Sequence, residues 1–182
     1  GKYGVYPAMA QFATGNVSLG RLFARQQLTG NGAMFREFGN MALYMKYGHL
    51  YGKELCELAE DNQLHHSALY APGERGDLPG ASENHKLMYA AANCLGGLAW
   101  PGDYPHAWYQ AGYDYLMYWF DEVTDIGFWE EDSPTYLVHH LGPILSVLEF
   151  APQGSQMKRK VQMVYEWYLA SVAGEYLKGY WI

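Results

Sequence analysis

Three features of the sequence predict an all-α fold. From Met34 onward, apolar residues recur every three or four positions, which places them on one face of an α-helix. Alternation of polar and apolar residues, which is typical of strands, never extends over a useful length. Turn residues separate the periodic stretches as they do in helical hairpins. The expected architecture is a set of helical hairpins forming part of an (α/α) toroid, with an irregular helical bundle as the alternative.

Composition places these helices in a single folded domain covering residues 1–182. Hydrophobic residues make up 49% and charged residues 17% of the chain, which excludes an intrinsically disordered protein. The net charge is −7 and no basic run is longer than that from Lys158 to Lys160, so we expect no nucleic-acid partner. The apolar stretches are too short to predict a membrane span.

Two further expectations follow from the first residue of the sequence and from its cysteines. The chain begins with Gly1 and shows no signal-peptide pattern, so we expect a processed or excerpted sequence. Cys56 and Cys94 are the only two cysteines. They allow at most one disulfide, and their spacing does not decide whether it forms.

The first half of the chain alternates between turn-rich and periodic segments. Residues 1–33 are rich in glycine and turn residues around one short predicted helix over 19–28. The apolar spacing then predicts helices over 34–48 and 52–63 with a tight turn between them. The stretch 71–84 is rich in proline, glycine and charge, which predicts a loop about a dozen residues long.

Four more helices are predicted after this loop. Ser82 or Asn84 is the candidate N-cap of the first, and Pro105 suits the first turn of the second. Apolar and aromatic residues at helical spacing support all four. They cover residues 85–98, 105–122, 136–150 and 157–177.

Glu83, Asn84 and His85 form the first candidate site, where the loop meets a helix N-terminus. An amide and an imidazole there can polarise an anionic or carbonyl group and take up a proton, because this end of a helix favours negative charge. The alternative interpretation is structural: Asn84 caps the helix and Glu83 is merely exposed.

The second candidate site lies in segment 128–143, and its residues are Glu130, Glu131, Asp132, Tyr136, His139 and His140. Helical spacing predicts that the last three share one face. A tyrosine hydroxyl that points into a cleft near a histidine can act as a general acid or base. The alternative is a buried core tyrosine with one exposed histidine.

Other chemistry-bearing patterns are weaker. His65 and His66 lack the accompanying ligand spacing of a metal site, so no metal is predicted there. The dense aromatic stretch 107–120 suits core packing and also a stacking platform for sugar rings. The sequence has no P-loop, no GxSxG elbow and no dinucleotide fingerprint, which removes most nucleotide chemistry.

Together the two candidate sites resemble motifs of the (α/α)-toroid polysaccharide lyases, which include alginate lyases and heparinase-like enzymes. Asn84-His85 followed by KLMYAAANCL is similar to the Asn-Asn-His motif that opens an inner helix in these enzymes. Tyr136 lies seven residues before Pro143, as does the catalytic tyrosine of the family. Asn84 and Tyr136 are 52 residues apart, which suits two intervening toroid helices with their loops.

The resemblance implies β-elimination across a uronic acid in a polysaccharide or oligosaccharide substrate. Asn84 would neutralise the substrate carboxylate, His85 would abstract the C5 proton, and Tyr136 would act as base or protonate the leaving oxygen. No metal and no cofactor are implied. The family has an arginine seven residues before the tyrosine, where this chain has Trp129, so Arg75, Lys86 or a residue outside this chain would have to supply that charge.

The resemblance also extends to substrate contacts, assembly and location. We expect a secreted or periplasmic protein, and because a full toroid needs more helices than this chain forms, a fragment or a ring completed by other chains. The residues expected to contact substrate are Glu83, Trp129, Glu131, His139 and His140.

Two alternatives to the lyase stay open. A glycoside hydrolase on the same scaffold would need two facing carboxylates, for which Glu83, Glu130, Glu131 and Asp132 are available. A non-catalytic helical module that binds glycans or self-assembles would need neither, and would use Asn84 and Tyr136 only as cap and core.

Overall fold

The structure is a computed structural model that describes residues 4–30, 34–67, 82–127, 134–177 and 180–181. The described residues confirm the all-α class. They form eight α-helices: α1 (Val5–Ala13), α2 (Val17–Thr29), α3 (Met34–Tyr47), α4 (Lys53–Ser67), α5 (Glu83–Ala99), α6 (His106–Ile126), α7 (Pro134–Phe150) and α8 (Gln156–Glu175). The remaining elements are a short 3-10 helix, η1 (Gly48–Leu50), and an antiparallel pair of two-residue strands, β1 (Tyr176–Leu177) and β2 (Tyr180–Trp181).

Helix α1 is the element that periodicity failed to predict. Its residues Val5, Ala8 and Phe12 are buried at helical spacing, but neighbouring glycines and Pro7 concealed this pattern. Proline is tolerated in the first turn because the N–H it lacks would have no partner within the helix. The other predicted helices are present with shifted ends.

Three expected helix boundaries are corrected. Glu83 and Asn84 belong to α5 rather than to the preceding loop, and the rest of that loop, residues 71–81, lies outside the described residues. Pro105 is the N-cap residue of α6 rather than part of its first turn. Helix α8 ends at Glu175, two residues before the predicted end.

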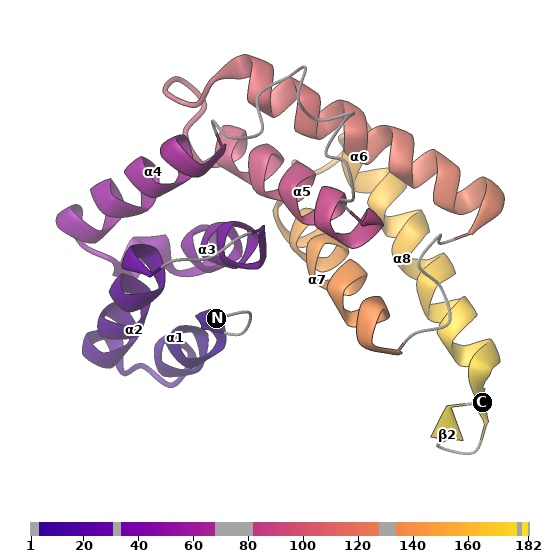
Figure 1. Cartoon of the computed structure of the whole chain (residues 1–182), viewed down its shortest axis with the longest axis horizontal. Helices are drawn as coiled ribbons and strands as arrows, with labels where there is room; N and C mark the ends of the chain where they lie inside the picture. Colours follow the sequence, from indigo (N-terminus) through magenta and orange to yellow (C-terminus); the bar gives the residue numbers. More distant parts are fainter. Residues whose placement is uncertain (1–3, 31–33, 68–81, 128–133, 178–179, 182) are drawn as a thin grey trace.

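Helix α5 lies at the centre of the arrangement and packs against α3, α4, α6 and α7 (Figure 1). Contacts fix the helix directions. Ala90 of α5 faces Gly112 of α6, and Gly97 faces Tyr109, so these two helices are antiparallel. Phe35 of α3 contacts His85, and Met41 packs with Leu95, so α3 runs in the same direction as α5.

Three hydrophobic clusters form the core. The first joins α5, α6, α7 and α8, the second joins α1, α2, α3 and α4, and the third links α3 to α5 and the turn that follows it. Helices α3 and α5 therefore connect the two halves of the molecule. None of the described helices is both long enough and apolar enough to cross a membrane.

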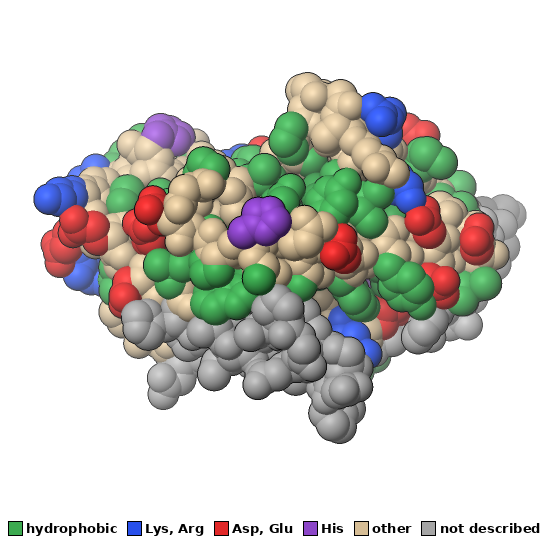
Figure 2. All heavy atoms as spheres, turned by 90° about the horizontal axis from the view of Figure 1, so that it is seen from above, with side chains coloured by type: hydrophobic (Ala, Val, Ile, Leu, Met, Phe, Trp, Pro, Cys, Tyr) green, Lys and Arg blue, Asp and Glu red, His purple; other side chains and the backbone are tan. Residues whose placement is uncertain are grey.

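Aromatic side chains occupy both the buried and the exposed sides of α6. Trp119 and Phe120 belong to the core, whereas the Tyr118 side chain is 51% exposed. Figure 2 shows one face of the molecule, where hydrophobic side chains are interspersed with acidic and basic ones. Cys56 and Cys94 are both free thiols in different hydrophobic clusters, so they do not pair.

A group of four polar side chains on α3 and α4 is buried, which the sequence pattern did not predict. Its members are Arg36, Glu37, Asn40 and Gln63. The Asn40 amide donates to Asn62, whose own amide donates to the carbonyl of Leu28 at the end of α2. Burial raises the pKa of Glu37 from 4.5 to about 7, although the neighbouring Arg36 charge lowers it.

Replacing Gly112 by alanine tests the close contact between α5 and α6. A Cβ atom there would lie 2.7 Å from the Ala90 carbonyl oxygen, so the helices must separate. We expect Gly112→Ala to lower the free energy of unfolding by about 1–3 kcal/mol, measured by urea denaturation. Gly102→Ala is the control, because nothing lies within 4 Å of that position. Equal stabilities of the two variants would contradict this packing.

Glu37 makes the stability of the fold depend on pH. Its pKa in the folded state, about 7, exceeds the unfolded value of 4.5, so the folded chain holds a proton that the unfolded chain releases between these values. The contribution of this proton to the free energy of unfolding is complete below pH 4.5 and is lost as the pH rises through 7. The loss amounts to up to about 3 kcal/mol. Glu37→Gln should remove that slope in denaturation measured from pH 5 to 8, while exposed Glu57→Gln should keep it.

Candidate functional site

The first turn of α5 holds the first group of candidate residues. Ser82 occupies the N-cap position, and its hydroxyl donates to Asn84 Oδ1 at 2.7 Å. Asn84 is the second residue of the helix and is 1% exposed, while Glu83 is 8% exposed. The cap interpretation is corrected in two particulars, because Ser82 rather than Asn84 occupies the cap position and Glu83 is buried rather than exposed.

Glu83 joins three helices through its buried carboxyl group. The indole Nε1–H of Trp119 in α6 donates to Glu83 Oε1 at 2.6 Å. Glu83 Oε2 lies 3.4 Å from His140 Nε2 of α7, and the His140 side chain is fully buried. The Trp119 and His140 rings also stack with an interplanar angle of 7°. One carboxyl group thus holds α5, α6 and α7 together.

One hydrogen bond of the His140 ring places a proton on Nδ1. Nδ1 is 3.0 Å from the Tyr136 carbonyl oxygen, which only accepts, so Nδ1 carries a proton. Nε2 faces Glu83 Oε2 at 3.4 Å.

His85 and His139 meet at the same aromatic ring. The Phe35 ring of α3 lies edge-on to His85 at 5.7 Å between ring centroids and to His139 at 5.0 Å. His85 is partly exposed, whereas His139 is 9% exposed. The two candidate motifs, far apart in the sequence, therefore come together at one end of the α5–α7 pair.

Tyr136 is exposed on α7, whereas the two histidines that follow it are buried. Its side chain is 46% exposed, in contrast to His139 and His140. All three residues lie in α7 at the predicted helical spacing, but the alternative of a buried tyrosine with one exposed histidine is wrong. The reason is that α5 and α3 cover the His139 and His140 positions, a non-local contact that spacing alone does not reveal.

A small pocket lies beside His139 and is lined by Phe35, Phe38, Val138 and Pro143 among others. Its volume is about 50 Å³, which accommodates water but is well below the roughly 300 Å³ at which ligand pockets begin. Pro143 within α7 has no N–H to donate to the His139 carbonyl, so that oxygen loses its usual helical partner. The pocket has the size of a water site rather than of a sugar site.

Several candidate residues lie outside the described part of the chain. Trp129 and Glu131 are among them, as are Glu130, Asp132 and Arg75. His65 and His66 belong to α4, but their side chains are not described. Lys86 is partly exposed in α5. Among the described residues, no three His, Cys, Asp or Glu side chains are grouped as in a metal site.

Sequence reasoning did not single out two aromatic residues of this region. Trp119 stood within the dense aromatic stretch 107–120, and Phe35 within the apolar periodicity of α3. Neither pattern distinguishes a residue that contacts the candidate site from one that only fills the core. Comparison of the chain with protein-family models, curated proteins and solved structures gives no match.

A double-mutant cycle tests the bond between Trp119 and Glu83. Trp119→Phe keeps a ring but removes the indole donor, leaving a buried carboxyl oxygen without that bond, so we expect a loss of about 1.5–3 kcal/mol in urea denaturation. In a Glu83→Leu background the same change should cost at least about 1 kcal/mol less. Additive effects of the two substitutions would show that the bond does not form.

Proposed function

We propose that this chain is the helical part of a carbohydrate-active enzyme that cleaves a uronic-acid-containing polysaccharide by β-elimination. The observation that carries the proposal is the meeting of the two motifs at one end of α5 and α7. His85 and His139 contact the same Phe35 ring, and Glu83 faces His140. A site needs groups from separate segments to meet in this way, and an isolated cap or core residue does not.

In this proposal His85 and Tyr136 are the two groups that exchange protons with the substrate. His85 removes the C5 proton, the electron pair of that bond forms the C4–C5 double bond, and the C4–oxygen bond breaks. The leaving oxygen then takes the Tyr136 hydroxyl proton. Both side chains are accessible, since His85 is partly exposed and Tyr136 is 46% exposed.

Asn84 and the Glu83 network act as positioning groups in the same proposal. Asn84 is 1% exposed, so a substrate carboxylate reaches its amide only if the first turn of α5 moves. The buried bonds from Glu83 to α6 and α7 hold that turn against the helix that carries Tyr136. Their effect on the reaction would come through the distance between His85 and Tyr136.

The toroid and the location belong to the proposal as well. Helices α3 and α5 run in the same direction, and α5 with α6 forms an antiparallel hairpin, as consecutive hairpins of an (α/α) toroid require. Other chains, or further parts of a longer chain, would complete the ring. A secreted or periplasmic location follows from the polysaccharide substrate.

The test is incubation with a panel of uronate polysaccharides, following the near-ultraviolet absorbance of the unsaturated product. We expect absorbance to rise with one polymer. Tyr136→Phe or His85→Gln should lower the rate of this rise by about 10²–10⁴-fold. Tyr118→Phe is a matched control, since Tyr118 is 51% exposed on α6, and exposed His106→Gln is the control for His85. A flat trace from folded protein across the panel would reject elimination.

The Glu83 carboxyl supports a second candidate, a glycoside hydrolase, because a buried carboxyl beside a histidine is the kind of group that serves as a general acid. The same incubation separates the two activities. A hydrolase releases reducing ends without the absorbing product and loses activity in Glu83→Gln. A non-catalytic glycan-binding module would produce neither signal.

A further inference from the structure

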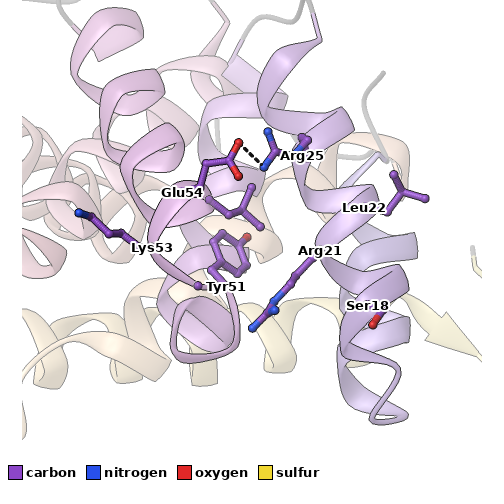
Figure 3. Close-up of a pocket in the computed structure, with 9 residues that line it drawn as sticks. Ser18, Arg21, Leu22, Arg25, Tyr51, Lys53 and Glu54 are labelled. Carbon is purple, nitrogen blue, oxygen red and sulfur yellow. Dashed lines mark ion pairs between the residues drawn. The ribbon is translucent and has the colours of Figure 1, made fainter.

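A second, larger pocket lies between α2 and the start of α4 (Figure 3). Helices α2 and α4 lie at the left of Figure 1, apart from α7. Its volume is about 410 Å³, within the roughly 300–1,000 Å³ range of small-molecule sites. Residues of α2 form one wall, and the turn at Tyr51 with the first turn of α4 forms the other. The size suits a molecule comparable to a monosaccharide or somewhat larger.

The charge of this pocket is opposite to that of the whole chain. Its lining includes Arg21, Arg25 and Lys53 but a single carboxylate, Glu54, whereas the chain has a net charge of −7. Arg25 is already paired, with its guanidinium 2.8 Å from Glu54 Oε1. Lys53 lies 3.7 Å from Glu57 on the same helix face, a highly exposed pair that contributes little.

Arg21 is the cation of the pocket that has no carboxylate partner among the described residues. Its Nε–H donates to the Leu50 carbonyl oxygen at 2.6 Å, which fixes the plane of the guanidinium. Figure 3 shows Arg21 reaching from α2 towards the turn that carries Tyr51. A Cβ atom on Gly52 would lie 3.7 Å from its Cζ, so this glycine leaves room beside the guanidinium. Among the residues that the structure describes, no hydrogen bond or ion pair occupies its two terminal nitrogens, which leaves their donors for a ligand.

We propose that this pocket binds a small molecule that carries an oxyanion, that is a carboxylate, sulfate or phosphate group, through the terminal nitrogens of Arg21. A guanidinium fixed in one plane matches two oxygens of such a group with two parallel hydrogen bonds. The start of α4 adds favourable potential, because the N-terminal end of a helix attracts negative charge. This site does not depend on the proposed lyase activity.

Four probes with the same sugar body test the proposal: glucuronate, glucose 6-sulfate, glucose 6-phosphate and neutral glucose, each titrated by NMR. We expect saturable shifts with at least one anionic probe, weaker binding at higher salt, and none with glucose. The probe that binds identifies the oxyanion. Binding of glucose equal to that of the anions, or binding of no probe at all, would overturn the proposal.

Variants assign the binding to this pocket. Arg21→Gln should lower the affinity for the anionic probe by at least about tenfold, because it removes a charged hydrogen-bond donor. Arg159→Gln is the matched control. Arg159 also donates to a backbone carbonyl, that of Gly154, but it lies on α8, away from the pocket lining. Unchanged affinity in a folded Arg21→Gln protein would contradict the proposal.

A further variant covers the case in which Arg21→Gln fails to fold. Ser18→Glu adds a carboxylate to the lining from an exposed position on α2 and leaves the bond to Leu50 intact, so the same loss of affinity is expected. Unchanged binding in this variant would overturn the site. Tyr136→Phe should bind the probe normally, so failure of the lyase proposal and failure of this one remain distinguishable.

Discussion

The burial of helix α5 on all sides is the constraint on which the rest of the structure depends. From Leu87 to Gly96 every residue of this helix is buried. Such a helix needs partners that approach closely, and glycines allow this. Gly112 lets α6 lie against the Ala90 carbonyl, and Gly96 leaves space for the ring of Tyr104 to pack against α5. Close approach on this scale turns a loose helical array into a packed core, because dispersion contacts require near-contact distances.

Burial also forces the polar side chains of α5 to find partners within the protein. Asn93 receives a hydrogen bond from the Tyr104 hydroxyl at 2.8 Å, and Glu83 receives one from Trp119 while facing His140. Unsatisfied, each of these groups would cost about 1–3 kcal/mol. The same bonds that make the burial of Glu83 tolerable also bring α7 to the first turn of α5. Stability and the geometry of the candidate site therefore rest on shared contacts.

The two proposed sites lie in different halves of the molecule and differ in character. The residues at the ends of α5 and α7 are mostly buried and the Glu83 carboxyl faces His140, whereas the pocket between α2 and α4 is open and cationic. An open pocket of one charge within an acidic chain concentrates anions locally, even though the whole chain repels them. The α1–α4 half can thus recognise a charged group without using the helix ends that would carry the chemistry.

Sequence alone determined the helical class and the positions of the helices from α2 to α8, because apolar spacing within a helix is a local property. It also indicated that Glu83, His85, His139 and His140 belong to candidate segments for a site, without showing which of them touch. Only the tertiary structure decided that Glu83 and Glu37 are buried, that Tyr136 is exposed, and that Arg21 faces a pocket. The burial of a charged side chain depends on the helix that packs over it, and that helix can be far away in the sequence.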